Sequence, residues 1–450
     1  MIRYTLQRAA ELCFAQLLGG DAETEFHGLS SDSRLLRAGE LFVALSGARV
    51  DGHDYVRQAA EQGAVAAIVE RPQDGGVPQL VVDDSMTALS QLAANWRHEQ
   101  AVQVVGITGS NGKTTVKNLV ASILSGQAPT LATRGNYNNE LGLPLTLCKL
   151  HAEHHYAVLE MGARHAGDID VLAALAAPQV GLVNNAGPAH LETFGGLDGV
   201  ARAKGEMYSS LPADGIAIIN ADDHYAPLWR GLAGKRRIIE FGRAAGAAVR
   251  TDDPGPECRI QTPAGSFEVR LQLHGPHNVM NALAATAIAI ALDIPLDVIT
   301  AGLQQTDAEP GRMAYSESPG GWLVIDDAYN ANPASLYAAI STVMQEAGGE
   351  LWLVLGDMGE LGDGERKLHA EMGEAAQNLG VSRLYACGEL CREAVRGFGR
   401  GARHFASREA LTAALLDDIR PGVRCLVKGS RSAGMEVVAA ALRTAAGGTA

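Results

Sequence analysis

One segment of the chain, residues 104–115, restricts its fold more than any other. The segment has the sequence VVGITGSNGKTT, so an apolar run leads into a glycine-rich turn and then into a stretch that opens a helix. A strand, a glycine turn and a helix in this order aim backbone N–H groups and the helix N-terminus at one point, an arrangement that binds phosphate. We expect Lys113 to reach the terminal phosphates and the Thr114 hydroxyl to bind Mg²⁺.

The strict pattern of such a phosphate loop, G-x-x-x-x-G-K-[ST], is not met, because Ile107 stands where the first glycine is required. The nearest glycines are Gly106 and Gly109, so we interpret the segment as a variant phosphate loop (P-loop). A chance glycine turn followed by a lysine is the alternative, and the order of strand, turn and helix disfavours it. The residues predicted to surround the phosphates are Gly109, Ser110, Asn111, Gly112, Lys113, Thr114 and Thr115.

The length and charge of the chain limit the classes of protein to which it can belong. With 450 residues it exceeds the size of a single hydrophobic core, and a prior of about 150 residues per domain suggests three domains. A hydrophobic content of 47% and a charged content of 20% are ordinary for a globular enzyme. The net charge of −14, without any basic block, argues against nucleic acid as a partner.

The composition also bears on the cellular compartment. Arg3, Arg8 and Glu11 lie among the apolar residues at the N-terminus, a pattern that indicates an amphipathic helix rather than a signal peptide. The longest apolar run, residues 282–292, has about half the length of a membrane span. The six cysteines are scattered without a C-x-x-C pair, which favours reduced thiols and a cytoplasmic protein.

Apolar runs and helical stretches alternate along most of the chain, and this alternation predicts right-handed βαβ units with parallel sheets. We therefore expect an α/β protein with three domains. These are a small N-terminal domain (1–83), a central P-loop domain that includes a small β-rich patch (84–312), and a C-terminal Rossmann-like domain (313–450). The strands that bear on a site are predicted at residues 156–160, 180–184, 322–326 and 424–427.

Polar residues that follow apolar strands are the first site candidates, because ligands of open α/β sheets gather at the carboxyl ends of the strands. Glu160 ends one such strand, and its carboxylate suits Mg²⁺ beside a triphosphate, with a solvated acid as the alternative. His190 follows the next strand, although a lone loop histidine is more often surface decoration. Lys204 lies in a predicted helix and by itself has the features of a surface lysine. Asn138 and Asn139 are either turn formers or substrate-facing amides.

Three further candidate groups lie later in the chain. Asn278, beside His277, is expected to be the N-cap of a long Ala-rich helix. Arg312 lies in a Pro-Gly-Arg break, either as a solvated linker residue or as a hinge guanidinium that domain closure moves onto a phosphate. Asp326 and Asp327 end an apolar strand, where they either bind ribose hydroxyls or cap the local structure.

Taken together and in order, these motifs resemble the Mur ligase family, the ATP-dependent amide ligases of peptidoglycan precursor synthesis, over nearly the whole chain. The resemblance implies ATP and two Mg²⁺ ions, with Thr114, Glu160 and His190 as metal ligands. It also implies that Lys204 serves the second metal as a carbamate formed with CO₂. The residues implied to bind the rest of ATP are His277, Asn278, Asn281, Arg312, Asp327, Tyr329 and Asn330. The implied catalytic residues are Lys113, Lys204, His190 and Arg312.

Within the family, four segments are most similar to the branch that adds D-alanyl-D-alanine: residues 160–164, 189–195, 326–333 and 428–431. This resemblance implies UDP-N-acetylmuramoyl-tripeptide and D-alanyl-D-alanine as substrates, and a monomeric enzyme. Residues 432–434 (SAG) are smaller than is usual in that branch. The implied substrate-binding residues are Ser31, Ser33 and Arg34 for the UDP end, and Asn138, Asn139, Lys428, Ser430 and Arg431 elsewhere.

Three alternatives remain open. A sister ligase that adds a single amino acid is disfavoured, because the diaminopimelate-adding enzymes carry an Asp-Asn-Pro-Arg motif that this chain lacks. A ligase like folylpolyglutamate synthase would have no UDP-binding domain and would leave residues 1–83 without a role. A nucleotide-binding regulator would keep the P-loop but would not need Glu160, His190 and Lys204 together.

Overall fold

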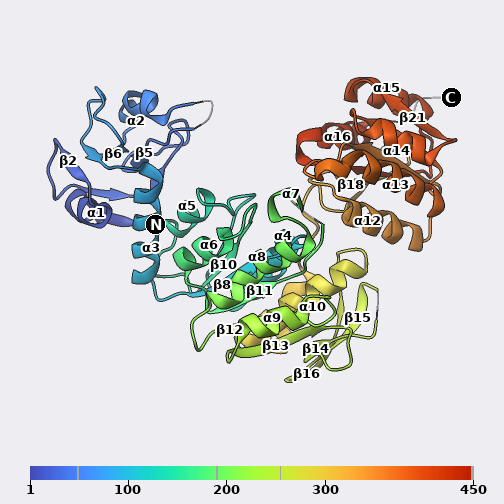
Figure 1. The fold of residues 1–450 in the computed structure, drawn as a ribbon, viewed down its shortest axis with the longest axis horizontal. Helices are drawn as coiled ribbons and strands as arrows, with labels where there is room; N and C mark the ends of the chain where they lie inside the picture. Colours follow the sequence, from blue (N-terminus) through green and yellow to red (C-terminus); the bar gives the residue numbers. More distant parts are fainter. Residues whose placement is uncertain (48–49, 189–190, 254, 447–450) are drawn as a thin grey trace.

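The computed structural model divides the chain into three α/β parts that follow one another along the sequence (Figure 1). It describes residues 1–47, 50–188, 191–253 and 255–446. Within these residues no helix is both long and apolar enough to cross a membrane. The predicted α/β class with parallel sheets is confirmed, and each part is built around a sheet of its own.

The N-terminal part is a small α/β unit. Its strands are β1 (Arg3–Thr5), β2 (Gln16–Leu18), β3 (Glu25–His27), β4 (Leu29–Ser30), β5 (Leu41–Val43), β6 (Ala66–Val69) and β7 (Gln79–Val81), and its helices are α1 (Leu6–Cys13), η1 (Gly52–Tyr55) and α2 (Val56–Glu61). The main sheet has the order β2-β7-β6-β5-β4, with β4 to β7 parallel and β2 antiparallel. Helix α2 packs on one face of this sheet and α1 on the other.

Helix α3 (Ser85–Glu99) joins the core of the N-terminal part to that of the central part. Asp84 caps it, because its Oδ1 accepts a hydrogen bond from the backbone N–H of Thr87 at 2.6 Å. Leu89 and Leu92 of α3 belong to one apolar cluster that also contains residues of the N-terminal sheet and of the central sheet. The predicted boundary at residue 84 therefore lies at the start of a helix that both parts share.

The central part is a nine-stranded sheet in the order β16-β15-β14-β13-β12-β11-β8-β10-β9. Its strands are β8 (Gln103–Thr108), β9 (Thr130–Ala132), β10 (Tyr156–Glu160), β11 (Val180–Val183), β12 (Ile216–Asn220), β13 (Arg237–Gly242), β14 (Val249–Arg250), β15 (Glu257–Thr262) and β16 (Gly265–Arg270). The pairs from β9 to β14 are parallel, and β15 and β16 add two antiparallel strands at one edge. The expected β-rich patch is thus a continuation of the central sheet.

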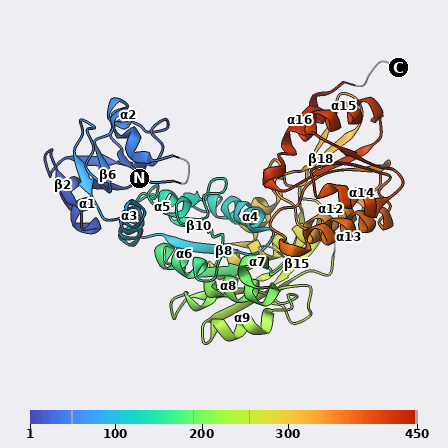
Figure 2. The same ribbon diagram turned by 45° about the horizontal axis from the view of Figure 1, so that its top comes forward.

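Helices cover both faces of the central sheet (Figure 2). They are α4 (Lys113–Ser125), α5 (Gly142–Leu147), α6 (Asp168–Ala176), α7 (Leu191–Phe194), α8 (Leu197–Ser209), α9 (Ala226–Ala233), α10 (Pro276–Ala291) and α11 (Leu296–Gln304). Helices α4 and α10 bury Val120 and Leu283 against one face, whereas α6, α8 and α9 cover the other with α3. The small side chains of α10 let it pack closely, so almost every residue from Val279 onward is buried.

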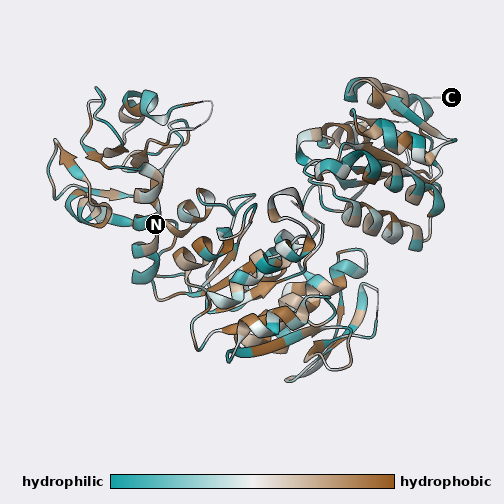
Figure 3. Ribbon diagram, viewed as in Figure 1, coloured by the Kyte–Doolittle hydropathy of each residue, from teal (hydrophilic) through white to brown (hydrophobic). Residues whose placement is uncertain are grey.

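The C-terminal part has a six-stranded sheet in the order β17-β18-β22-β19-β20-β21, parallel except for β17. Its strands are β17 (Ala314–Glu317), β18 (Leu323–Asp327), β19 (Leu351–Gly356), β20 (Arg383–Cys387), β21 (Ala402–Phe405) and β22 (Arg424–Lys428). Its helices are α12 (Pro333–Gln345), η2 (Gly362–Gly364), α13 (Glu365–Asn378), α14 (Cys391–Phe398), α15 (Arg408–Asp418), η3 (Arg431–Ala433) and α16 (Glu436–Thr444). Figure 3 shows the apolar strands of this sheet between helices with polar outer faces.

All six cysteines lie in described residues and are free thiols. Five of them are buried in the cores, and Cys387, at the end of β20, is partly exposed. Burial raises the pKa of the buried thiols, for example that of Cys258 to about 11. The cysteines therefore behave as apolar core residues, in agreement with the reduced state that their scattered spacing predicts.

Candidate nucleotide-binding site

The P-loop has the predicted order of strand, turn and helix. β8 ends at Thr108, α4 begins at Lys113, and Gly112 is the N-cap of α4 with a left-handed backbone (φ +78°). A Cβ atom on Gly112 would lie 2.5 Å from Asn281 Oδ1 and 2.6 Å from Asn184 Nδ2. Glycine is therefore required here both by the backbone conformation and by the close approach of two amides.

Asparagines that follow β11 hold the P-loop in place. Asn185 Oδ1 accepts a hydrogen bond from the backbone N–H of Asn111 at 2.9 Å. Asn184 Nδ2 donates to the Asn111 carbonyl at 3.0 Å and to Asn281 Oδ1 at 2.9 Å, so it ties the loop to α10. The sequence analysis missed Asn184 and Asn185. Glu160 was selected because polar residues at the carboxyl ends of parallel strands tend to bind ligands. Asn184 and Asn185 meet the same criterion, because they follow β11, which pairs with the P-loop strand β8.

Lys113 folds back on the loop that precedes it. Its Nζ donates to the Gly109 carbonyl at 2.7 Å. Burial lowers the pKa of Lys113, and the nearby Arg312 guanidinium lowers it further, while the Glu160 carboxylate raises it. Two cations, Lys113 and Arg312, thus lie close enough to lower the pKa of Lys113 despite the nearby Glu160 carboxylate, a condition that favours the binding of an anion.

Thr114 and Glu160, predicted separately as metal ligands, are in direct contact. Thr114 Oγ1 donates to Glu160 Oε2 at 2.8 Å, and Asn138 Nδ2 donates to Glu160 Oε1 at 2.7 Å. Glu160 is only 3% exposed, so this carboxylate is a preformed buried acceptor rather than a solvated strand end. His190, the third predicted ligand, lies outside the described residues.

Lys204 is buried, which excludes the alternative of a surface lysine. It lies in α8 with a relative exposure of 2%, and its Nζ is 6.0 Å from the centre of the Phe194 ring. Burial, with a smaller contribution from the positive charge of Lys113, lowers the pKa of Lys204 to about 7. A substantial fraction of this amine is therefore neutral, and nucleophilic, near neutral pH.

The start of α10 corrects one prediction. Asn278 is not the N-cap, because the helix begins at Pro276, a residue favoured in the first turn, with Gly275 as the cap. Asn278 Nδ2 instead donates to the His274 carbonyl at 2.8 Å, and its Oδ1 accepts from Asn281 Nδ2 at 2.9 Å. Burial lowers the pKa of the neighbouring His277, so this ring is neutral at physiological pH.

Arg312 lies on the link between the central and C-terminal parts and is half-buried rather than fully solvated. Its guanidinium carbon is 4.0 Å from the centre of the Tyr329 ring, and its Nε is 3.6 Å from Glu309 Oε2. The same Nε is buried without a hydrogen-bond partner among the described residues. A half-buried guanidinium whose buried Nε lacks a hydrogen-bond acceptor is suited to an anionic ligand that supplies it.

The acids and bases predicted in the C-terminal part pair with one another. Asp327 forms an ion pair with Lys428, whose Nζ also donates to the Asn330 carbonyl at 3.0 Å. Ser430 Oγ donates to the Asp357 carbonyl at 2.6 Å. Arg431 is exposed, so it is the member of this group most accessible to an incoming substrate.

The remaining predicted substrate residues are bound locally. Asn139 Oδ1 accepts from the backbone N–H of Gly142 at 2.9 Å and so fixes the start of α5. In the N-terminal part, buried Ser33 donates to Gln58 Oε1 at 2.9 Å, while Ser31 is half-buried. Arg34 is exposed and lies 2.7 Å from Asp32, a pairing that lowers the pKa of that carboxyl. The structure does not bring this group to the P-loop, which lies in another part of the chain (Figure 1).

A cluster that the sequence analysis did not predict, Asp357, His369 and Cys391, has the residue types of a metal site. Both ring nitrogens of His369 are already engaged: Nδ1 donates to the Glu365 carbonyl at 2.7 Å, and Nε2 accepts from the backbone N–H of Met358 at 3.0 Å. Asp357 Oδ1 accepts from the Cys391 N–H at 2.8 Å. The cluster therefore has a structural role in closing the loop after β19.

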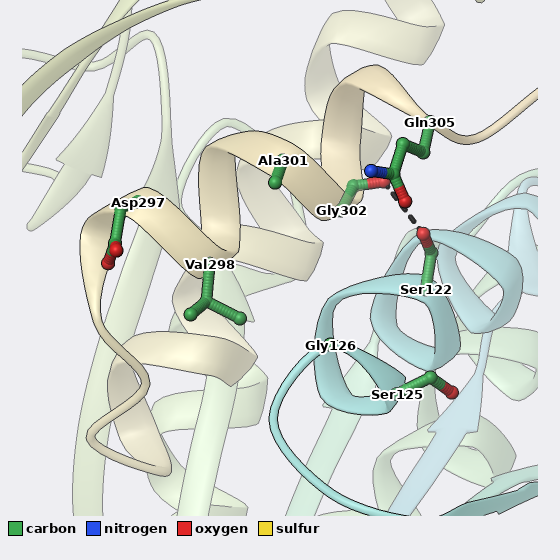
Figure 4. Close-up of a pocket in the computed structure, with 8 residues that line it drawn as sticks. All are labelled: Ser122, Ser125, Gly126, Asp297, Val298, Ala301, Gly302 and Gln305. Carbon is green, nitrogen blue, oxygen red and sulfur yellow. Dashed lines mark hydrogen bonds between the residues drawn. The ribbon is translucent and has the colours of Figure 1, made fainter.

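A pocket of about 430 Å³ lies between α4 and α11 (Figure 4). Inside it, Ser122 Oγ donates to the Gly302 carbonyl at 2.9 Å. At a rise of about 1.5 Å per residue, the Ser125 end of α4 is about 18 Å from Lys113. This pocket is therefore separate from the candidate site.

The fold and the site define a P-loop protein of three α/β parts, with an arginine of the link between the last two parts close to the loop. Three family models match the chain in order: "Mur ligase family, catalytic domain" at residues 25–97, "Mur ligase middle domain" at 107–289 and "Mur ligase, glutamate ligase domain" at 311–431. The UDP-N-acetylmuramoyl-tripeptide--D-alanyl-D-alanine ligase of Escherichia coli K12 is 42% identical over 98% of this chain and 99% of its own length. The chain belongs to the Mur ligase family.

Solved structures agree with this assignment. A crystal structure of MurF from Acinetobacter baumannii superposes with a TM-score of 0.92 at 38% identity, over 98% of this chain and 99% of that one. MurF from Thermotoga maritima in complex with ADP superposes with a TM-score of 0.83 at 28% identity, over 93% of this chain and 97% of that one. The arrangement of three parts is thus shared with these two structures over nearly the whole of each chain.

Proposed function

We propose that this chain is an ATP-dependent, ADP-forming ligase that joins UDP-N-acetylmuramoyl-tripeptide to D-alanyl-D-alanine in peptidoglycan precursor synthesis. The observation that carries the proposal is its 42% identity, over nearly the full length of both chains, to a relative named for that reaction. The P-loop with its buried carboxylate and two nearby cations supplies the ATP site that such a reaction needs. A single-amino-acid ligase, a folate-type ligase and a non-catalytic regulator have no comparable support.

The chemistry explains why cations are gathered at the P-loop. A carboxylate is a poor acyl donor, so the tripeptide carboxylate first attacks the γ-phosphate of ATP, which gives an acyl phosphate and ADP. The amine of D-alanyl-D-alanine then attacks the acyl carbon, an amide forms and phosphate leaves. Negative charge builds in both steps, and Lys113 and Arg312 are the residues that we expect to stabilise it.

The oxygen atoms beside the P-loop fit Mg²⁺. The Thr114 hydroxyl and the Glu160 carboxylate lie 2.8 Å apart, and hard oxygen donors of this kind are the ligands that Mg²⁺ prefers. Bound Mg²⁺ would neutralise charge on the β- and γ-phosphates. Thr114 and Glu160 would hold a first ion, and His190 with a carbamate on Lys204 would hold a second.

The carbamate rests on the environment of Lys204. The neutral Nζ attacks the carbon of CO₂, an N–C bond forms while the electron pair of one C=O π bond moves to oxygen, and one N–H proton is released, so the neutral amine becomes an anionic carbamate. A pKa lowered to about 7 makes the neutral amine available for this step. The modification would place a negative charge at this buried position, where a bound metal ion would compensate it.

The other predicted residues are assigned by part. We propose that residues 1–83 bind the UDP end through Ser31, Ser33 and Arg34, and that 84–312 hold ATP through the P-loop and the start of α10. Residues 313–450 would contact ribose through Asp327 and the dipeptide through Arg431. The remaining proposed contacts are His277, Asn278, Asn281, Tyr329 and Asn330 for ATP, and Asn138, Asn139, Lys428 and Ser430 for the peptide substrates.

The test is phosphate release from ATP in Mg²⁺ and bicarbonate, with UDP-muramoyl-tripeptide and D-alanyl-D-alanine added alone and together. We expect release that needs both substrates and a product heavier by one dipeptide less water. Release with UDP-muramoyl-dipeptide and a single amino acid instead would make the chain a sister ligase. Light scattering of the same sample would test the proposed monomer, and fractionation of the source cells the proposed cytoplasmic location.

A further inference from the structure

The tip of the P-loop has a side-chain partner in the C-terminal part of the molecule. Asn332 Nδ2 donates a hydrogen bond of 3.1 Å to Asn111 Oδ1, across a separation of 221 residues in the sequence. The backbone of Asn111 is already fixed by Asn184 and Asn185, so its side chain has a defined position. The contact therefore joins a rigid loop to a residue of another part.

Asn332 has a second role that fixes its own position. It is the N-cap of α12, where its Oδ1 accepts from the backbone N–H of Ser335 at 2.8 Å, and Ser335 Oγ accepts from the Asn332 N–H at 3.0 Å. The Asn332 amide thus uses its oxygen to cap α12 and its nitrogen to bind the P-loop. This division orients Nδ2 toward Asn111 without any loss of helix capping.

We propose that Asn332 is a positioning residue for the nucleotide site, which seats the start of α12 on the tip of the P-loop and so couples ATP binding to the placement of the C-terminal part. The proposal rests on the proposed function, because it requires ATP to bind at the P-loop. Tyr329, in the loop between β18 and α12, donates its N–H to the Gly311 carbonyl at 3.0 Å and packs on Arg312, so a shift of α12 would also move the group that we assign to the phosphates. If Asn332 served only to cap α12, its substitution would leave the affinity for ATP unchanged.

Two substitutions separate the roles of the Asn332 amide. Asn332→Ser keeps a good N-cap but is too short to reach Asn111, and Asn332→Asp keeps the cap and the size but loses the donor. We expect each variant to raise the Kd for a fluorescent ATP analogue and the KM for ATP roughly ten-fold, the effect of one hydrogen bond at a phosphate site, with kcat changed much less. The melting temperature should stay close to that of the wild type.

The matched control is Ser335→Ala, which removes the other half of the capping box and leaves the amide of Asn332 intact. We expect it to lower the melting temperature and to leave ATP binding unchanged. A loss of ATP affinity in Asn332→Asp but not in Asn332→Ser would be an effect of the added charge and would overturn the proposal. If Ser335→Ala lost as much ATP affinity as the Asn332 variants, Asn332 would act only as a helix cap, and the proposal would be overturned as well.

A double-mutant cycle tests the partner. In an Asn111→Ala background, Asn332→Ser should cause no further loss of ATP affinity, because the hydrogen bond is already absent. Additive losses would overturn the pairing. A wild-type chain that binds no ATP at all would overturn the proposed function itself, whereas wild-type binding with unaffected Asn332 variants would overturn this inference alone.

Discussion

The nucleotide site and the candidate UDP site of the N-terminal part are built in different ways. Around the P-loop, Glu160 contacts Thr114 across 46 residues and Asn281 contacts Asn184 across 97. In the N-terminal part, Arg34 contacts Asp32 two residues away, and its side chain is 79% exposed. The nucleotide site is therefore fixed by the tertiary fold, while Arg34 is free to exchange its local partner for a ligand.

The largest expected effect tests the fixed site. Gly112→Ala places a Cβ atom 2.5 Å from Asn281 Oδ1 on a left-handed backbone, and a strain of about 2–3 kcal/mol predicts a loss of roughly 100-fold in kcat/KM. Gly126→Ala at the other end of α4 is the control, because its φ of −69° suits alanine. Steady-state kinetics of both variants give the result. Equal activities would mean that the loop adapts and that the site is not rigid.

A pH titration tests Lys204, at the edge of the same site. Because the pKa of Lys204 is lowered to about 7, its neutral fraction rises with pH through that value. At constant dissolved CO₂ the fraction of neutral amine should rise about ten-fold from pH 6 to pH 8. The carbamate carbon is observed by ¹³C NMR with labelled bicarbonate, and Lys204→Arg removes the signal. A carbamate signal that persists in Lys204→Arg would assign it to another amine.

A smaller effect is expected in the N-terminal part, where Arg34 is exposed. Arg34→Ala should raise the KM for the UDP substrate roughly five-fold with kcat unchanged, since it removes one charge-assisted contact to the ligand. Arg37→Ala, an exposed arginine three residues on, is the control. If both variants behave alike, the effect is one of overall charge, and Arg34 has no specific contact.

The smallest expected effect is that of Ser33→Ala, which tests whether Ser33 stabilises the fold or contacts the UDP substrate. This hydroxyl is buried and donates to Gln58 Oε1 at 2.9 Å. Ser33→Ala should lower the free energy of unfolding by about 1 kcal/mol, the usual contribution of such a hydrogen bond. Chemical denaturation measures that loss. An unchanged stability with a raised KM for the UDP substrate would instead place Ser33 in contact with the ligand.

Local order in the sequence was sufficient to predict the core of the site. The P-loop requires only that a strand, glycines and a helix follow one another, and Glu160 was found because it ends an apolar strand. The parallel pairing of β10 and β8 then brings the ends of both strands to one edge of the sheet. Strand β10 itself has the predicted limits, Tyr156–Glu160.

Other features depended on packing that no local pattern contains. Lys204 has the sequence context of a surface lysine, and only the tertiary packing of α8 buries it. The cap of α10 was misplaced because Asn278 is a common cap residue, whereas Pro276 starts the helix earlier. The contact between Asn332 and Asn111 joins residues that only the arrangement of two sheets brings together.

Only one of the six cysteines, Cys387, is partly exposed, so the chain can be labelled at a single site. A maleimide probe will react first at Cys387, because the other five thiols are buried. Since β20 is three strands from β18, a probe at its carboxyl end will lie about 14 Å from the end of β18, where Asp327 is found. A fluorophore attached there, without any engineered cysteine, will report movements of the C-terminal sheet as nucleotide is added.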